Sequence, residues 1–323
     1  MRHEARVVDA QWVGSRRSGW LLAFCLTMLA PLAATAATAA TAAAPESALQ
    51  TRLQARTEGF AGTVALYARN LDTGREVGLE SDRRVRTAST IKLPIACALA
   101  AEVAAGRARW DERLVIRAQD KVSGSGVLSE FTSGESVSLR DAMVLMIVVS
   151  DNTATNLILD RIGADAVNEF MISLGFEATR SMRKIRGDGT QLKPAEGWSR
   201  AGDKAENKRF GIGSSTPREM VRLLDLLEQG KIVDPATSRE LLAVLERQQY
   251  KDGIGRKTGE LRVASKSGSL DALRSDVGIV YTPAGRIAIA ITVDDMPAID
   301  YSPENVGNRL ISDLTQILLE DLK

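Results

Sequence analysis

Apolar and polar positions alternate with a period of two near both ends of the chain. Short runs of this kind, bounded by Gly, Asn, Asp or Pro, are typical of antiparallel strands. They occur at residues 63–68, 76–79, 262–265, 275–281 and 286–293. We therefore predict a hairpin early in the chain and an antiparallel meander near its end.

The middle of the chain instead has the periodicity of helices. Apolar residues spaced by three and four positions predict helices over 89–105, 139–149, 153–162, 164–174, 216–227 and 234–248. Two more helices, over 46–57 and 303–322, flank the predicted strands.

This order of elements predicts an α+β fold, with an antiparallel sheet flanked by helices. Both chain ends build the sheet part, residues about 45–86 and 257–323. An all-helical part, residues about 87–256, is inserted between them.

Residues 1–44 have the layout of a secretory signal. Four Arg precede an apolar run from Gly19 to Leu32, and an Ala/Thr tract follows up to Ala44. We predict that this segment is removed, which leaves a secreted or periplasmic catalytic domain over 45–323 without a membrane span. An uncleaved N-terminal anchor is the alternative, and the sequence leaves the export route open.

Charge and cysteine content exclude several classes of function. Without residues 1–44, which hold four Arg and two acids, the 42 basic and 41 acidic residues become 38 and 39. This balance predicts no nucleic-acid partner. Cys97 is then the single cysteine, so no intrachain disulfide forms, and we expect it to be buried on its apolar helix.

The absence of histidine restricts the chemistry further. The chain has one histidine, His3, within the predicted signal. Mechanisms that need a Ser–His–Asp or Cys–His arrangement, and zinc sites that need imidazole, are therefore excluded. We expect no metal or cofactor, so a hydrolase of this sequence needs Lys or a carboxylate as its base.

Ser89 and Lys92 form a candidate nucleophile and base. In a helix, residues three apart share a face, so the hydroxyl and the amine can come within hydrogen-bonding reach. Partial desolvation would lower the pKa of Lys92 and let it accept the proton of Ser89. A capping serine beside a solvated lysine is the alternative, and Ser181 with Lys184 repeats the spacing elsewhere.

Two further polar clusters stand downstream of S-x-x-K. S-D-N begins at Ser150, 61 residues after Ser89, and K-S-G begins at Lys266, another 116 residues on. These three ordered motifs resemble those of the class A β-lactamases and related penicillin-recognising serine enzymes. The resemblance spans residues about 46–323 and implies the β-lactamase/transpeptidase-like fold. The rival K-T-G at Lys257 precedes the predicted strand, so we favour Lys266.

The resemblance implies four catalytic residues. Ser89 would attack the lactam carbonyl and Lys92 would share its proton. Ser150 would pass a proton to the lactam nitrogen, and Lys266 would keep that relay electropositive.

The same resemblance implies a set of substrate-binding residues. Asn152 would hold the substrate's side-chain amide, and Gly268 would permit close backbone approach. The N–H groups of the nucleophile and of Ser269 would form the oxyanion hole. Arg274, together with Ser267, would hold the substrate carboxylate, the alternative for Arg274 being a solvated residue on a strand face.

One motif of the class A enzymes is missing. Their E-x-x-L-N loop carries the Glu that activates the deacylating water, whereas Ile185 falls near that position here. The acids of the loop, none of them in this motif, are Asp188, Glu196, Asp203 and Glu206. We therefore predict acylation through Lys92 and slow deacylation.

The predicted function is that of a class A β-lactamase-type serine hydrolase, acylated at Ser89 by small-molecule β-lactams. A D,D-peptidase-like enzyme acting on peptidoglycan peptides is the first alternative. A non-catalytic binding module on the same fold is the second. The sequence leaves the physiological substrate and the oligomeric state open.

Overall fold

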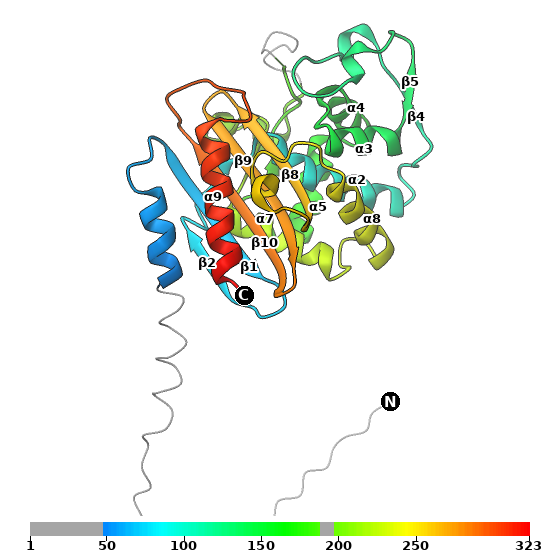
Figure 1. Ribbon diagram of the computed structural model, residues 1–323. Helices are drawn as coiled ribbons and strands as arrows, with labels where there is room; N and C mark the ends of the chain where they lie inside the picture. Colours follow the sequence, from blue (N-terminus) through cyan, green and yellow to red (C-terminus); the bar gives the residue numbers. More distant parts are fainter. Residues whose placement is uncertain (1–47, 188–196) are drawn as a thin grey trace, which may run out of the picture. The chain divides into compact units, whose positions relative to one another are not determined.

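Strands from the two ends of the chain form one sheet (Figure 1). The computed structural model describes residues 48–187 and 197–323. Five antiparallel strands have the order β2-β1-β10-β9-β8. They are β1 (Thr63–Asn70), β2 (Glu76–Leu79), β8 (Arg262–Leu270), β9 (Leu273–Thr282) and β10 (Gly285–Asp294). The predicted hairpin and meander are confirmed, and β8 lies at an edge of the sheet.

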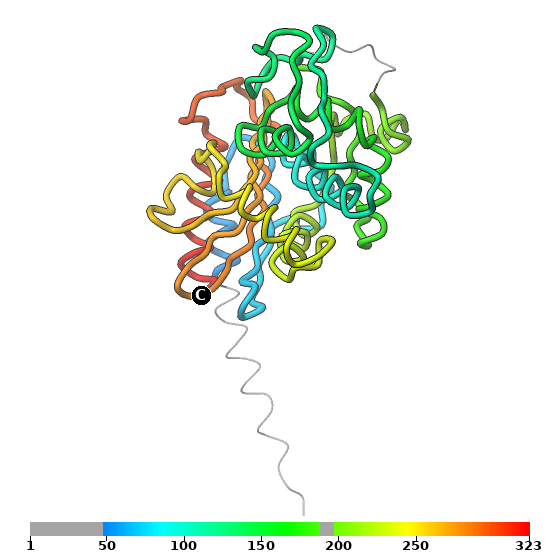
Figure 2. Tube along the Cα trace, turned by 90° about the vertical axis from the view of Figure 1, so that its right-hand side faces the viewer, coloured from blue at the N-terminus to red at the C-terminus, as the bar shows by residue number. Residues whose placement is uncertain are grey.

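Side chains of the sheet alternate between two hydrophobic cores. Ile287, Ile289 and Ile291 of β10 face the core that also contains α9 (Val306–Asp321) and the first helix, which ends at Thr57. Ala288 and Ala290 face the other core, which the helices of the middle of the chain complete. The sheet therefore has helices on both faces (Figure 2), which makes the predicted α+β fold correct.

The helices lie close to their predicted positions, with one exception. They are α2 (Lys92–Ala104), α3 (Leu139–Val148), α4 (Asn152–Ile162), α5 (Ala164–Ser173), α6 (Arg200–Asp203), α7 (Pro217–Glu228) and α8 (Pro235–Glu246). The exception is the short α6, which periodicity did not predict. Ser138 caps α3 by accepting from the N–H of Asp141, and Thr216 caps α7 in the same way. Cys97 is buried on α2, as expected.

Short strands and turns connect these helices. A three-stranded sheet has the order β3 (Val85–Arg86), β7 (Gly213–Ser215), β6 (Arg180–Ser181), and β4 (Arg113–Val115) pairs with β5 (Ser136–Ser138). The 3₁₀ turns are η1 (Ala88–Ile91), η2 (Ala118–Asp120), η3 (Leu128–Glu130), η4 (Ala205–Phe210) and η5 (Ile254–Lys257). Strands of two or three residues are too short to show alternation, so periodicity did not reveal them.

Candidate active site

Ser89 lies on the 3₁₀ turn η1, directly before the buried helix α2. Ala88, which precedes it, has a φ of 46°, a left-handed conformation that non-glycine residues rarely adopt. Strand β8 passes so close that a Cβ on Gly268 would lie 2.8 Å from the Ser89 nitrogen. The close backbone approach expected at Gly268 is therefore present, and it brings the third motif against the first.

Lys92 is fully buried and points at the second motif. Its Nζ donates to the Ser150 carbonyl at 2.6 Å, to the Ser150 Oγ at 3.1 Å and to Asn152 Oδ1 at 2.9 Å. Burial lowers the pKa of Lys92 well below its usual value, and the nearby charge of Lys266 lowers it further, against the opposing effect of Asp151. These effects favour a neutral amine, which can accept a proton.

The hydroxyl of Ser150 is shared by two lysines. Lys266, also fully buried, donates to Ser150 Oγ at 3.1 Å and to the Ser267 carbonyl at 2.7 Å. Burial lowers the pKa of Lys266 to about 7, although the carboxylate of Asp276 acts in the opposite direction. Ser150 itself has a φ of 53°, so strained backbone holds its side chain between the two amines.

Contact between Ser89 and Lys92 is less direct than the helical spacing indicates. Within the described residues, the Ser89 hydroxyl has no hydrogen bond, whereas Lys92 bonds to Ser150 and Asn152. The reason is that Ser89 belongs to the 3₁₀ turn and α2 begins only at Lys92. Lys92 is therefore hydrogen-bonded to residues about 60 positions further along the sequence.

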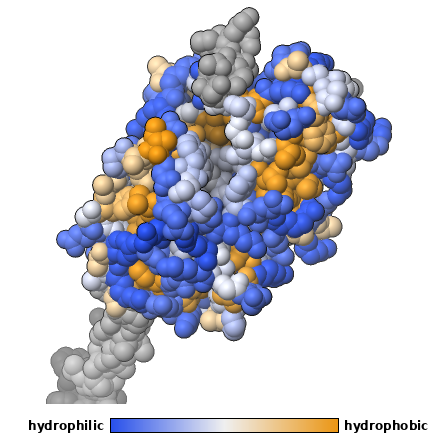
Figure 3. Space-filling model, turned by 45° about the horizontal axis from the view of Figure 1, so that its top comes forward, coloured by the Kyte–Doolittle hydropathy of each residue, from blue (hydrophilic) through white to orange (hydrophobic). Residues whose placement is uncertain are grey.

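A cavity of about 550 Å³ connects the predicted residues. Its walls include seven of the nine, namely Ser89, Ser150, Asn152, Ser267, Gly268, Ser269 and Arg274, and the other two are Lys92 and Lys266 beneath Ser150. Figure 3 shows the hollowed face between the two parts of the fold. The three motifs thus meet at one site.

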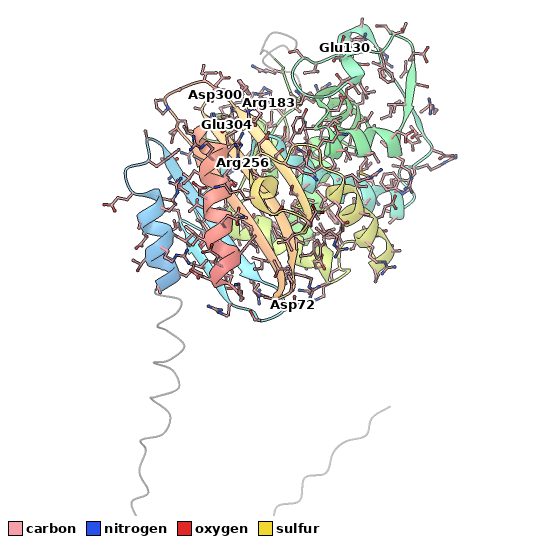
Figure 4. The ribbon with its side chains drawn as sticks, viewed as in Figure 1. Asp72, Glu130, Arg183, Arg256, Asp300 and Glu304 are labelled. Carbon is pink, nitrogen blue, oxygen red and sulfur yellow. The ribbon has the colours of Figure 1, made fainter. Side chains whose placement is uncertain are left out.

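Arg274 is buried rather than solvated on a strand face. Its guanidinium donates to the carbonyls of Leu270 and Leu273, each at 2.6 Å, and to that of Asp300, which Figure 4 labels. No carboxylate pairs with it among the described residues, and burial lowers its pKa. Tyr301, Asp300 and Asp271 oppose that effect without forming an ion pair, so this cation in the cavity wall is suited to holding an anionic group of a ligand.

Ile185, which falls near the expected position of the missing Glu, lines the cavity. Asn156 of α4 holds its backbone, since Asn156 Nδ2 donates to the Ile185 carbonyl and the Ile185 N–H donates to Asn156 Oδ1, both at 2.8 Å. Asp203 and Glu206 are exposed and do not line the cavity. Asp188 and Glu196 lie outside the described residues.

Replacing Asn156 with Ala should lower the stability of the protein, because Asn156 bonds to the backbone of Ile185. The change leaves a buried N–H and carbonyl without partners, so we expect the free energy of unfolding in urea to fall by about 1–3 kcal/mol. Asn168→Ala is the matched control, because Asn168 makes the same two bonds to Ser181, which does not line the cavity. An unchanged stability of Asn156→Ala would contradict the anchoring role.

Neither the serine nor the lysine of the rival S-x-x-K lines the cavity, and the lysine of the rival K-T-G does not line it either. Lys257 donates to Asp313 of α9 at 2.7 Å, on the surface. Ser181 is buried on β6, and Lys184 forms an ion pair with Asp160 at 2.7 Å. The preference for Ser89 and Lys266 agrees with these positions.

Sequence reasoning did not single out several residues of the cavity wall. Asp276 is fully buried there, its Oδ2 accepting from the Ile254 N–H at 2.9 Å, and burial raises the pKa of this carboxyl to about 7. Its place directly after Arg274 and Ser275 was the available signal. Tyr250 and Tyr301 also line the cavity, and no sequence pattern marked them.

Comparison with known proteins agrees with this geometry. The sequence profile of the beta-lactamase enzyme family matches residues 48–322. The chain belongs to the beta-lactamase enzyme family. Family membership explains why this chain, whose described residues contain no histidine, brings S-x-x-K, S-D-N and K-S-G to one cavity.

Three members of the group illustrate the similarity. Beta-lactamase L2 of Stenotrophomonas maltophilia is 28% identical over 221 residues, which cover 67% of this chain and 68% of that protein. The crystal structure of a beta-lactamase from Sphaerobacter thermophilus has a TM-score of 0.73 and 33% identity, covering 85% of this chain and 97% of that one. A variant of PBP-A, solved as an acyl-enzyme complex with penicillin G, has a TM-score of 0.71 and 27% identity, covering 85% and 96%.

Proposed function

We propose that this protein is a serine hydrolase that is acylated at Ser89 by β-lactams and hydrolyses their amide bond slowly. The observation that carries the proposal is the convergence of Lys92 and Lys266 on one hydroxyl, that of Ser150, beside Ser89. Two buried amines can supply and receive protons without histidine, which the described chain does not contain.

Acylation begins with the transfer of a proton from Ser89. In its neutral form, Lys92 has a lone pair that can accept the Ser89 proton while Oγ forms a bond to the lactam carbonyl carbon. The backbone N–H groups of Ser89 and Ser269, which line the same cavity, would stabilise the negative charge on the carbonyl oxygen.

Ring opening needs a proton on the departing nitrogen. The Ser150 hydroxyl can give this proton and regain one from Lys92, to which it is hydrogen-bonded. Lys266 donates to the same oxygen and so disfavours accumulation of negative charge there. The products of this step are an ester on Ser89 and a free amine on the opened ring.

Three residues of the cavity would position the substrate. Arg274, which has no acidic partner among the described residues, would hold the substrate carboxylate together with Ser267. Asn152 uses its Oδ1 for Lys92 and its Nδ2 for the Ser123 carbonyl at 2.9 Å, so a substrate amide would have to replace the latter bond.

Hydrolysis of the ester is the slow step in this proposal. Ile185 places an apolar side chain where a carboxylate could activate water, and no acid of the described loop residues lines the cavity near it. Lys92 would then serve as the base of deacylation. General-base loss slows a reaction by about 10²–10⁴-fold, which predicts an acyl-enzyme that lasts minutes.

The same observation favours a second candidate, a D,D-peptidase-like enzyme acting on peptidoglycan peptides. An enzyme that transfers or slowly releases acyl groups has no need of a fast deacylating base. A variant of the similar protein PBP-A forms an acyl-enzyme with penicillin G, a step that both candidates require. Turnover of a D-Ala-D-Ala peptide, compared with turnover of a penicillin, distinguishes the two.

Export is a further part of the proposal. The layout of residues 1–44 supports a secreted or periplasmic location for the catalytic domain. Those residues lie outside the described part of the chain. Within the described part, none of the helices has both the length and the apolar character needed to span a bilayer.

Installing a carboxylate at position 185 should accelerate deacylation. We expect Ile185→Glu to shorten the lifetime of the penicillin adduct by about 10²-fold, the lower end of general-base effects. Asn156 bonds to the backbone of residue 185, so the change leaves these two hydrogen bonds in place. The new carboxylate would therefore extend from the cavity wall. Intact-mass spectrometry at successive times after mixing with penicillin measures the lifetime.

Ile185→Gln is the control, since it has nearly the same shape as Glu but cannot act as a base. Equal lifetimes for the Glu and Gln variants would show that a carboxylate at this position does not reach the hydrolytic water. A wild-type protein that hydrolyses a cephalosporin hundreds of times per second would contradict the slow step itself.

A further inference from the structure

A second cavity lies apart from the one that contains Ser89. It has a volume of about 270 Å³ and shares no wall residue with the first. It is found at the end of β10 opposite the end that Asp72 marks in Figure 4. Four arginines, Arg83, Arg84, Arg86 and Arg209, contribute to its wall, against two acids, Asp294 and Asp295.

One of the four arginines is neutralised. Arg86 forms a two-point ion pair with Asp294, with its Nε 2.8 Å from Oδ2 and a second nitrogen bonded to Oδ1. Asp295 is exposed at the rim and accepts from the Thr63 hydroxyl at 3.2 Å. The cavity therefore retains an excess of positive charge.

Arg84 and Arg209 are held against the same ring. Their guanidinium carbons lie 4.3 Å and 4.5 Å from the centroid of Phe210. Arg84 also donates to Ser214 Oγ, at 3.0 Å from Nη2 and 3.3 Å from Nε, whereas the guanidinium of Arg209 has no hydrogen-bond partner within the described residues. Neither forms an ion pair in that part of the chain.

This arrangement keeps like charges close together. Burial lowers the pKa of Arg84, and repulsion from Arg180 and Arg209 lowers it further, with Glu219 and Glu206 acting in the opposite direction. The carboxylate of Glu219 is already engaged by the N–H groups of residues 177–179. An anion in the cavity would reduce the repulsion between these guanidinium groups.

We propose that this cavity is a binding site for a doubly charged oxyanion of the phosphate type, either free or as a small phosphate ester. Guanidinium groups bind phosphate oxygens through two parallel N–H bonds, and Arg209 has its donors available for this. Arg84 and Arg83 complete a positively charged wall around the same space. The volume accommodates a phosphate with a small substituent.

The site is close in sequence to the nucleophile. Arg84 and Arg86 flank Val85 of β3, and the chain continues through Thr87 and Ala88 to Ser89. Ligand binding at the arginines would therefore restrain the segment that positions the nucleophile.

Titration with inorganic phosphate, against sodium chloride of equal ionic strength, tests the proposal. In protein with ¹⁵N-labelled arginine, the Nε–Hε signals of Arg84 and Arg209 should shift saturably with phosphate and little with chloride. Arg209→Gln should weaken the affinity by about tenfold or more, as expected for loss of hydrogen bonds to a charged group. Glucose 6-phosphate in place of phosphate shows whether an ester also fits.

Arg239→Gln is the matched control, because Arg239 is exposed on α8 and away from both cavities. Arg84→Lys keeps the charge but removes the two-point geometry, and should reduce the preference for phosphate over chloride. An equal phosphate response in wild type and Arg209→Gln, or a response that chloride reproduces, would overturn the site. Penicillin labelling of the same variants confirms that they are folded and tests the proposed catalytic function separately.

Discussion

Ser89→Ala is expected to abolish the covalent penicillin adduct that wild-type protein forms. Ser89 lies on the cavity wall next to the backbone of Gly268. Ser150, the common partner of the two lysines, lines the same cavity. The change removes only the attacking oxygen and leaves η1 and α2 intact. Intact-mass spectrometry should show the full mass of the penicillin on wild type and none on the variant.

A complete loss is expected because Ser89 is the cavity serine on the turn that leads directly into Lys92, the proposed base. Ser150 is buried and engaged by both lysines. Ser181→Ala is the control, because Ser181 belongs to the repeated S-x-x-K but lies outside the cavity. Loss of the adduct in Ser181→Ala, or its persistence in Ser89→Ala, would show that the nucleophile is wrongly assigned.

Lys92→Ala is expected to slow acylation by about 100-fold or more, as for other groups that transfer protons in catalysis. Lys92 is an amine beneath Ser150 whose pKa is lowered well below its usual value, by burial first and by Lys266 second. Stopped-flow or timed mass spectrometry with excess penicillin measures the rate constant. Lys184→Ala is the control, since Lys184 pairs with Asp160 away from the cavity.

The pH dependence distinguishes a base from a structural lysine. The amine accepts a proton only when neutral, so the wild-type acylation rate should fall as the pH decreases through the lowered pKa of Lys92. Lys92→Ala should lack this acidic limb. Because the change also removes donors from the Ser150 carbonyl and Asn152, its fold must be verified by circular dichroism. Near-normal labelling of the folded variant would exclude Lys92 as the base.

Local sequence determined most of the secondary structure. Alternation predicted β1, β9 and β10 because each strand separates two hydrophobic cores, so adjacent residues face opposite sides. Caps such as Ser138 and Thr216 act on N–H groups three residues away, and are therefore readable from the sequence. The three motifs were likewise recognisable as residue types at fixed spacings.

The sequence also predicted the residues of the site, but not their contacts. The partners of Lys92 come from Ser150 and Asn152, and those of Arg274 include the carbonyl of Asp300. Such contacts form only when α2, α4 and β8 pack together. Burial of Arg274, and the strained backbone of Ser150, follow from the same packing and have no local signature.

What the sequence by itself determined was the order of helices and strands, the absence of histidine chemistry and the residue types that replace it. Only the tertiary structure decided that both lysines bond to one hydroxyl, that Asn156 holds Ile185 in the cavity wall, and that four arginines surround a second cavity. The physical reason is that hydrophobic periodicity and capping act over a few residues, whereas desolvation and charge placement depend on segments that lie far apart in the chain.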